Sequence, residues 1–127
     1  MESLLNFLSL NVGMSSTLAG LSSLITANKL DLIFLQEVQL SSEQINLLLG
    51  KLGFQAAVNI DSENPSRPGT AIIWKKSLPV SNISTLVLCR AQLATLGKYM
   101  LLNIYSPSGT DKKHERNVFF GQDISNL

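Results

Sequence analysis

Two apolar segments of the chain each end in polar side chains that could bind a metal ion. Leu8-Ser9-Leu10-Asn11 ends in an amide, and Phe34-Leu35-Gln36-Glu37 ends in an amide and a carboxylate. In α/β proteins, the ends of buried strands are where a sheet usually presents its chemistry. Carboxylate and amide oxygens suit a hard divalent cation such as Mg²⁺. The two segments together predict a metal-dependent site for phosphodiester chemistry.

Both polar ends belong to elements that should form one crossover unit. The apolar run over 4–11 is typical of a strand that is covered on both faces. A helix should follow from Ser15 or Ser16 to about residue 29, and a second short strand over 31–35. Strand, helix and strand in this order form a right-handed unit with parallel strands. We therefore expect Asn11 and Glu37 to emerge at the same edge of one sheet.

The remainder of the chain combines one marked helix with short strands. Ser41 and Gln44 fit a capping box at the start of that helix, and Gly53 ends it. Further strands are expected over 54–58, 70–74, 83–93 and 99–105, with a surface loop over 62–69 and a hairpin turn over 95–98. Asp111 could cap a last helix that reaches Phe119 and Phe120. No repeat or linker divides the sequence, so a single domain should cover residues 1–127.

The composition fits one globular unit, because 45% of the 127 residues are hydrophobic and 15% are charged. The net charge of +1 provides no overall basic field, so contact with nucleic acid would depend on local basic side chains. Arg67, Lys75, Lys76 and Arg90 are candidates for phosphate contacts, although a scattered basic set is more often solvated surface. The single cysteine, Cys89, cannot form an intramolecular disulfide, which indicates a buried thiol in a reducing compartment.

We expect the protein to be intracellular, either nuclear or cytoplasmic, and not embedded in a membrane. The first residues lack the basic region and the long apolar core of a secretory signal. No stretch approaches the roughly 18 apolar residues that a membrane-spanning helix requires. The glycosylation sequon Asn82-Ile83-Ser84 is then an accident of composition.

Four segments, taken in order, resemble the deoxyribonuclease I-like endonuclease/exonuclease/phosphatase superfamily. They are Leu10-Asn11-Val12-Gly13, Ile33-Phe34-Leu35-Gln36-Glu37, Gly69-Thr70-Ala71-Ile72-Ile73-Trp74 and Leu102-Asn103-Ile104-Tyr105-Ser106-Pro107. The resemblance is greatest to the apurinic-type endonuclease domain of non-long-terminal-repeat retrotransposons. It implies an α/β (α+β) fold in which the chain supplies the N-terminal half of a four-layer α-β-β-α sandwich, with one mixed sheet and its covering helices.

The resemblance also implies a DNA-nicking endonuclease that depends on Mg²⁺ or Mn²⁺ and is associated with a reverse transcriptase. Asn11, Glu37 and Tyr105 correspond to catalytic residues, Glu37 and Asn11 as the metal site and Tyr105 as a phosphate contact. The metal would neutralise phosphate charge while an activated water attacks in line. Each residue also has a structural interpretation: Glu37 as a solvated loop residue, Asn11 as a turn residue, and Tyr105 as a packing aromatic.

The sequence departs from the family pattern in its second half. The family's Gly-Asp-x-Asn and Ser-Asp-His motifs, which activate water and stabilise the leaving group, do not occur in it. Gly121-Gln122-Asp123 does not replace the first motif, and the only histidine, His114, lies in a polar stretch. General-base catalysis needs a positioned proton acceptor, so the sequence predicts a chain that is inactive alone. The uncovered inner face of its sheet should then bind a second copy or a missing C-terminal half.

Two functional classes stay open. The first is the N-terminal part of a metal-dependent endonuclease, with DNA as its partner when the domain is completed. The alternative is a catalytically inactive domain that serves as a binding or assembly module, or a non-functional remnant of a mobile element.

Overall fold

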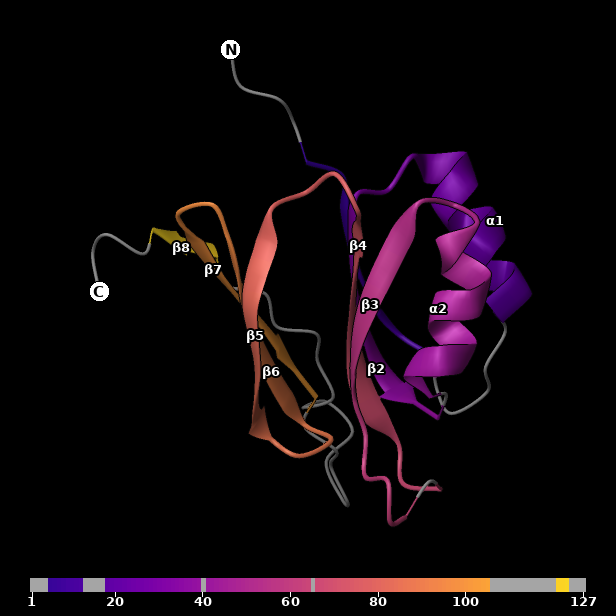
Figure 1. Ribbon diagram of the computed structural model, residues 1–127, viewed down its shortest axis with the longest axis vertical. Helices are drawn as coiled ribbons and strands as arrows, with labels where there is room; N and C mark the ends of the chain where they lie inside the picture. Colours follow the sequence, from indigo (N-terminus) through magenta and orange to yellow (C-terminus); the bar gives the residue numbers. More distant parts are fainter. Residues whose placement is uncertain (1–4, 13–17, 40, 65, 106–120, 124–127) are drawn as a thin grey trace.

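The described residues fold into two sheets that pack face to face, with two helices on the outer side of the first sheet (Figure 1). The computed structural model describes residues 5–12, 18–39, 41–64, 66–105 and 121–123. The mixed α+β class predicted from the sequence is confirmed. The expectation of one sheet is wrong, because the described residues from 80 onward form a second sheet that covers the first.

The first sheet has the strand order β1-β2-β4-β3. Its strands are β1 (Phe7–Asn11), β2 (Leu32–Val38), β4 (Gly69–Lys75) and β3 (Phe54–Asn59). The second sheet has the order β5-β6-β7-β8, and all its pairs are antiparallel. Its strands are β5 (Val80–Val87), β6 (Ala91–Leu96), β7 (Tyr99–Ile104) and β8 (Gly121–Asp123).

The crossover unit predicted at the start of the chain is confirmed. β1 and β2 are parallel neighbours, and helix α1 (Leu18–Asn28) connects them. Their register places Asn11 opposite Gln36, so Asn11 and Glu37 lie at one edge of the sheet. The predicted caps of this helix at Ser15 or Ser16 lie outside the described residues.

Helix α2 (Ser42–Gly50) begins with the predicted capping box. The Ser41 Oγ accepts a hydrogen bond from the Gln44 N–H at 3.2 Å, and the Gln44 side chain accepts one from the Ser41 N–H at 2.9 Å. These two bonds satisfy backbone donors that the first helical turn cannot pair internally. Gly53, at φ +80°, then turns the chain into β3 in a left-handed conformation that favours glycine.

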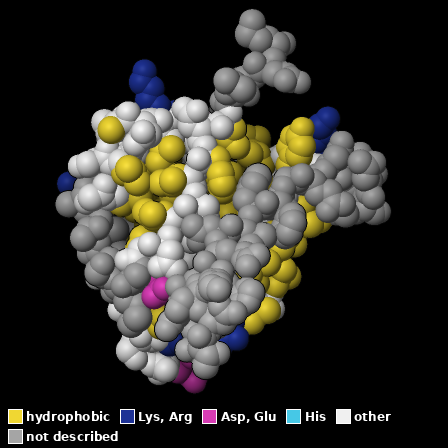
Figure 2. Space-filling view, turned by 180° about the vertical axis from the view of Figure 1, so that it is seen from behind, with side chains coloured by type: hydrophobic (Ala, Val, Ile, Leu, Met, Phe, Trp, Pro, Cys, Tyr) yellow, Lys and Arg dark blue, Asp and Glu magenta, His cyan; other side chains and the backbone are white. Residues whose placement is uncertain are grey.

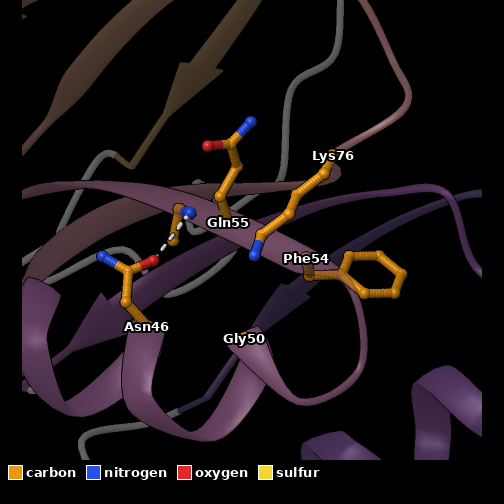
Figure 3. A pocket seen from close by; sticks show the side chains of 6 residues that line it. Asn46, Gly50, Phe54, Gln55 and Lys76 are labelled. Atoms are coloured by element: carbon orange, nitrogen blue, oxygen red, sulfur yellow. Dashed lines mark hydrogen bonds between the residues drawn. The ribbon is translucent and has the colours of Figure 1, made fainter.

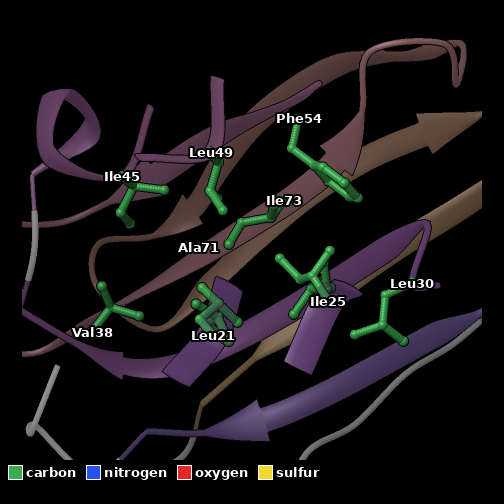
Figure 4. Close-up of a cluster of buried hydrophobic side chains, with 11 residues drawn as sticks. Leu21, Ile25, Leu30, Val38, Ile45, Leu49, Phe54, Ala71 and Ile73 are labelled. Atoms are coloured by element: carbon green, nitrogen blue, oxygen red, sulfur yellow. The ribbon is translucent and has the colours of Figure 1, made fainter. Parts of the chain in front are cut away.

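The core has two layers, one on each face of the first sheet. The helix-side layer packs α1 and α2 on the sheet (Figure 4), and its buried members are Leu21, Ile25, Leu30, Ile33, Leu35, Val38, Ile45, Leu49, Phe54, Ala71 and Ile73. The layer between the sheets contains Leu32, Phe34, Ile72, Trp74, Ala94 and Leu101. The inner face expected to be uncovered is therefore buried within the chain itself.

Some hydrophobic side chains stay exposed despite this packing. Figure 2 shows them gathered over part of the face seen from behind. Among the described residues, Leu47 and Leu86 are the most exposed large ones, at 76% and 54%. No helix in the described ranges is long and apolar enough to cross a membrane.

Two segments differ from the strands expected from the sequence. The run over 83–93 is divided between β5 and β6 by a tight turn at 88–90, which the Arg90 N–H closes on the Val87 carbonyl at 2.9 Å. Cys89 adopts φ +66° in this turn and is buried, as predicted for its thiol.

Residues 121–123, for which no strand was expected, form β8 against β7. The helix expected from Asp111 lies outside the described residues.

Candidate functional site

A bulge near the end of β2 presents Glu37 at the sheet edge. Gln36 pairs with Thr70 and Val38 pairs with Gly69, so Glu37 is an extra residue in the β2 strand. Its φ is +58°, a left-handed conformation that costs a non-glycine residue roughly 1–2 kcal/mol. The side chain is partly exposed, and no described residue engages its carboxylate in a hydrogen bond or ion pair. Bulges often re-aim a side chain beside an active site.

Asn11 lies next to this bulge at the end of β1. The Val12 N–H donates to the Gln36 carbonyl at 2.9 Å, which extends the parallel ladder one residue beyond Asn11. Leu8, Leu10 and Val12 pack on the helix-side core. Because side chains alternate along a strand, Asn11 belongs to the opposite face, toward the second sheet.

Tyr105 follows β7 at the same end of the sandwich. Its N–H donates to the Arg90 carbonyl at 2.7 Å, and its side chain is only 8% exposed. Asn103, two residues earlier, donates to the carbonyls of Leu35 and Ala71 in the first sheet. The structure thus brings the ends of β1, β2 and β7 together, and with them the three site residues predicted from the sequence.

A buried amide cluster supports this end of the sandwich. Gln36 Nε2 donates to Asn103 Oδ1 at 2.8 Å, and Asn103 Nδ2 lies 3.3 Å from Gln92 Oε1. Gln92 Nε2 donates to the Ala57 carbonyl at 2.9 Å. All three amide side chains are at most 2% exposed. Sequence reasoning missed this cluster, although Asn103 stands among residues that strand alternation assigns to the buried face.

The donor atoms at this end fit a hard divalent cation in chemical type. Glu37 offers a carboxylate and Asn11 an amide oxygen, and the buried Gln36 Oε1 has no hydrogen-bond donor among the described residues. Mg²⁺ commonly takes one or two protein carboxylates and keeps several waters. The described part of the chain contains no group of three or more His, Cys, Asp or Glu side chains that could hold a metal ion between them. Any cation here would therefore complete its shell with water, substrate oxygens or other groups.

A separate hollow of about 280 Å³ lies between α2 and β3 (Figure 3). Asn46, Gly50, Phe54, Gln55, Ala56 and Lys76 line it. The Lys76 N–H donates to the Gly53 carbonyl at 2.9 Å, at the end of the sheet opposite to Glu37. None of the described residues that line this hollow carries a carboxylate, so we do not assign it to the candidate site.

The charged pair of Asp31 and Lys75 also lies away from the candidate site, where β2 begins. Lys75 Nζ is 2.9 Å from the Asp31 carboxylate, and the Asn6 N–H donates to it at 2.9 Å. Burial raises the pKa of Asp31, but the Asn6 hydrogen bond and the Lys75 charge outweigh it and hold the pKa below its usual value. This pair therefore stabilises the fold and is not a candidate for catalysis.

Comparison with known proteins identifies the family. Residues 8–107 match the model of the endonuclease/exonuclease/phosphatase family. The chain belongs to this family. The match includes Asn11, Glu37 and Tyr105, and enzymes of the endonuclease/exonuclease/phosphatase family generally use divalent metals. No curated protein sequence matches the chain.

Two solved structures are similar to the chain. The chain is similar to D. rerio TDP2 complexed with a single-strand DNA product, with 21% identity and a TM-score of 0.56. That match covers 87% of this chain and 49% of the TDP2 chain, so our chain spans about half of its length. The human Nocturnin catalytic domain with a bound sulfate anion matches at 17% identity and a TM-score of 0.47, over 79% of this chain and 38% of that one.

Proposed function

We propose that the chain is the N-terminal part of a Mg²⁺- or Mn²⁺-dependent phosphodiesterase that nicks DNA and derives from a retrotransposon. One observation carries the proposal. The β2 bulge places Glu37 beside Asn11 in a strained backbone conformation, and the Glu37 carboxylate has no partner among the described residues. Strain of this kind is often associated with functional sites.

In this proposal the chain's own residues bind and orient. The Glu37 carboxylate and the Asn11 amide oxygen hold the cation, and Tyr105 contacts the phosphate. When bound, the cation neutralises charge on the phosphate. The hydrogen bond between Gln36 and Asn103 fixes the strand that carries Glu37 against the strand that leads to Tyr105.

DNA is the proposed substrate because the similar TDP2 structure contains a single-strand DNA product. The fold alone is weaker support, since one fold commonly serves several substrates. The retrotransposon origin rests on the resemblance of four sequence segments to the endonuclease domain of non-long-terminal-repeat retrotransposons. One of these segments is Leu102-Asn103-Ile104-Tyr105-Ser106-Pro107.

Full activity, in our proposal, needs a further segment that supplies the general base. The described site holds one carboxylate, and the chain spans about half of the TDP2 chain. The same observation favours the second candidate function, a catalytically inactive binding or assembly module. A second copy of the chain stays a proposed partner, although the second sheet already covers the inner face that first suggested it.

Nicking of supercoiled plasmid and binding of Mn²⁺, followed by electron paramagnetic resonance, test the proposal together. We expect Mn²⁺ binding and weak Mg²⁺-dependent nicking by the wild type, because the general base is missing, and loss of both in Glu37→Ala. Glu63→Ala is the matched control, because Glu63 is an exposed carboxylate in the loop before β4. Equal nicking by Glu37→Ala and wild type, or nicking that persists in EDTA, contradicts the metal site. Mn²⁺ binding without nicking supports the inactive module.

A further inference from the structure

Two arginines from different sheets line one hollow beside Tyr105. Arg67 precedes β4 in the first sheet, and Arg90 precedes β6 in the second. The hollow has a volume of about 210 Å³, and its lining residues are Arg67, Pro68, Cys89, Arg90 and Tyr105. Figure 1 shows the turn between β5 and β6 at the same end of the molecule as the connection between β3 and β4. The hollow therefore lies at the end of the sandwich that carries the candidate site.

Hydrogen bonds fix the backbone on the Arg90 side of the hollow. The buried Asn59 accepts from the Cys89 N–H at 2.9 Å and donates to the Val87 and Ala91 carbonyls at 3.0 and 3.3 Å. The turn that carries Arg90 is thus held by a side chain of the first sheet. Tyr105 donates its N–H to the Arg90 carbonyl, so the positions of Arg90 and Tyr105 are linked directly.

The Arg67 side is connected to the segment that follows Glu37. Gln39 Nε2 donates to the Ser66 carbonyl, and the Arg67 N–H donates to the Asn64 carbonyl at 3.0 Å. The first bond holds the loop before β4 against the end of β2, and the second lies within that loop. The Arg67 guanidinium is 3.7 Å from the Asp61 carboxylate and 37% exposed. A single ion pair near the distance limit leaves most of its five N–H donors available.

The charge and size of the hollow suit a phosphate. Among the described residues that line it, the two charged ones are both cations and none is a carboxylate. Arg90 is exposed and forms no ion pair with a described residue. Planar guanidinium groups match phosphate oxygens through paired hydrogen bonds. The hollow, at about 210 Å³, has room for a phosphate with its ester oxygens.

We propose that Arg67 and Arg90 form a subsite for a backbone phosphate of a DNA strand, next to the phosphate that Tyr105 contacts. This subsite rests on the proposed function in its choice of ligand, since the phosphate role of Tyr105 points to a nucleic-acid strand. The arginines bind and position the strand, and the subsite needs no metal. Binding there is electrostatic and independent of base sequence, so it weakens as salt rises.

Fluorescence anisotropy with a short labelled single-stranded oligonucleotide in EDTA tests the subsite. We expect Arg67→Gln/Arg90→Gln to bind about tenfold more weakly than the wild type, and to lower the slope of log affinity against log salt by about one, as expected for the loss of one phosphate contact. The matched control is Lys51→Gln/Lys98→Gln, which changes the net charge equally at exposed positions beside α2 and in the turn between β6 and β7. This control should stay within about twofold of the wild type, because salt screens distant charges. Equal thermal unfolding midpoints establish that the variants are folded, and Arg67→Lys/Arg90→Lys should show intermediate affinity.

Three results would overturn the subsite. The first is no oligonucleotide binding by the wild type, and the second is equal weakening by the arginine and lysine pairs. The third is displacement of the oligonucleotide by inorganic phosphate at an equal concentration of phosphate groups, which would assign the hollow to a free anion. The proposed function fails separately. Binding that depends on the arginines, together with nicking that is indifferent to Glu37→Ala, rejects the metal site and keeps the subsite. Nicking that depends on Glu37, with binding indifferent to the arginines, does the reverse.

Discussion

Gln36 on β2 and Asn103 on β7 share a hydrogen bond of 2.8 Å that crosses the two sheets, and solvent reaches neither side chain. Asn103 also donates to the carbonyls of Leu35 and Ala71. One amide therefore joins two neighbouring strands of the first sheet to the second. Such a network rigidifies a core when it is satisfied, and removal of one member takes a hydrogen bond from several buried groups at once.

Asn103→Leu should destabilise the protein by on the order of 3 kcal/mol, because the substitution removes the buried hydrogen bonds that Asn103 forms with Gln36, with Gln92 and with the carbonyls of Leu35 and Ala71. Urea unfolding measures the loss. Asn28→Leu is the control, since Asn28 is exposed at the end of α1 and donates only to the Leu24 carbonyl. It should cost less than about 0.5 kcal/mol. Similar values for the two variants would show that the cross-sheet bonds contribute nothing.

Glu37→Gly should unfold at higher urea than Glu37→Ala, with a difference of about 1 kcal/mol. Both variants remove the carboxylate, but only glycine adopts the observed φ of +58° without steric cost. The comparison is made in EDTA, so that metal binding does not contribute to stability. A Glu37→Ala variant as stable as Glu37→Gly would mean that the bulge stores no strain at this position.

Gly69→Ala should destabilise the protein by more than about 2 kcal/mol. A Cβ at Gly69 would lie 2.1 Å from the Asn59 carbonyl oxygen, and backbone must move to admit it. Gly50→Ala is the control, because a Cβ there has no atom within 4 Å. It should be neutral or stabilising by up to about 1 kcal/mol, as expected for alanine in a helix. The thermal unfolding midpoints of the two variants test this difference, and equal midpoints would contradict the close approach of β3 and β4.

Asp31→Asn should reduce stability near neutral pH and have a smaller effect in acid. Burial raises the pKa of Asp31, but the Asn6 N–H and Lys75 lower it further, so the folded pKa is below the unfolded one. A depressed carboxyl pKa stabilises the fold above the unfolded value of about 3.9, and this contribution is lost as pH falls through the folded pKa. Unfolding midpoints of wild type and variant should therefore converge below about pH 4. A constant difference at all pH values would contradict the ionised pair.

Local signals in the sequence predicted much of the first sheet and its helices. The capping box of Ser41 and Gln44 marked the start of α2, and the strand, helix and strand order fixed β1 parallel to β2. These features depend on residues close together in the chain. The same parallel arrangement placed Asn11 and Glu37 at one edge, which is why the common position of these two residues could be predicted.

Features that depend on distant residues were not predicted. The turn between β5 and β6 uses Cys89 at φ +66°, held by Asn59 some thirty positions earlier, and no glycine or proline marks it. The meeting of Arg67 and Arg90 likewise follows from the packing of two sheets. In the sequence, these arginines are indistinguishable from solvated surface charges.

The bulge in β2 changes which face of the sheet each later residue occupies. Leu32, Phe34 and Gln36 face the second sheet, whereas Val38, at the next even position, packs with the helix-side core. In an unbroken strand, the alternation would have directed the Glu37 side chain toward α1 and α2, where an unpaired charge is costly. One added residue lets Val38 take that buried place and frees the carboxylate for the edge. β2 therefore continues to Val38, and its one charged side chain avoids the apolar layer between the sheet and the helices.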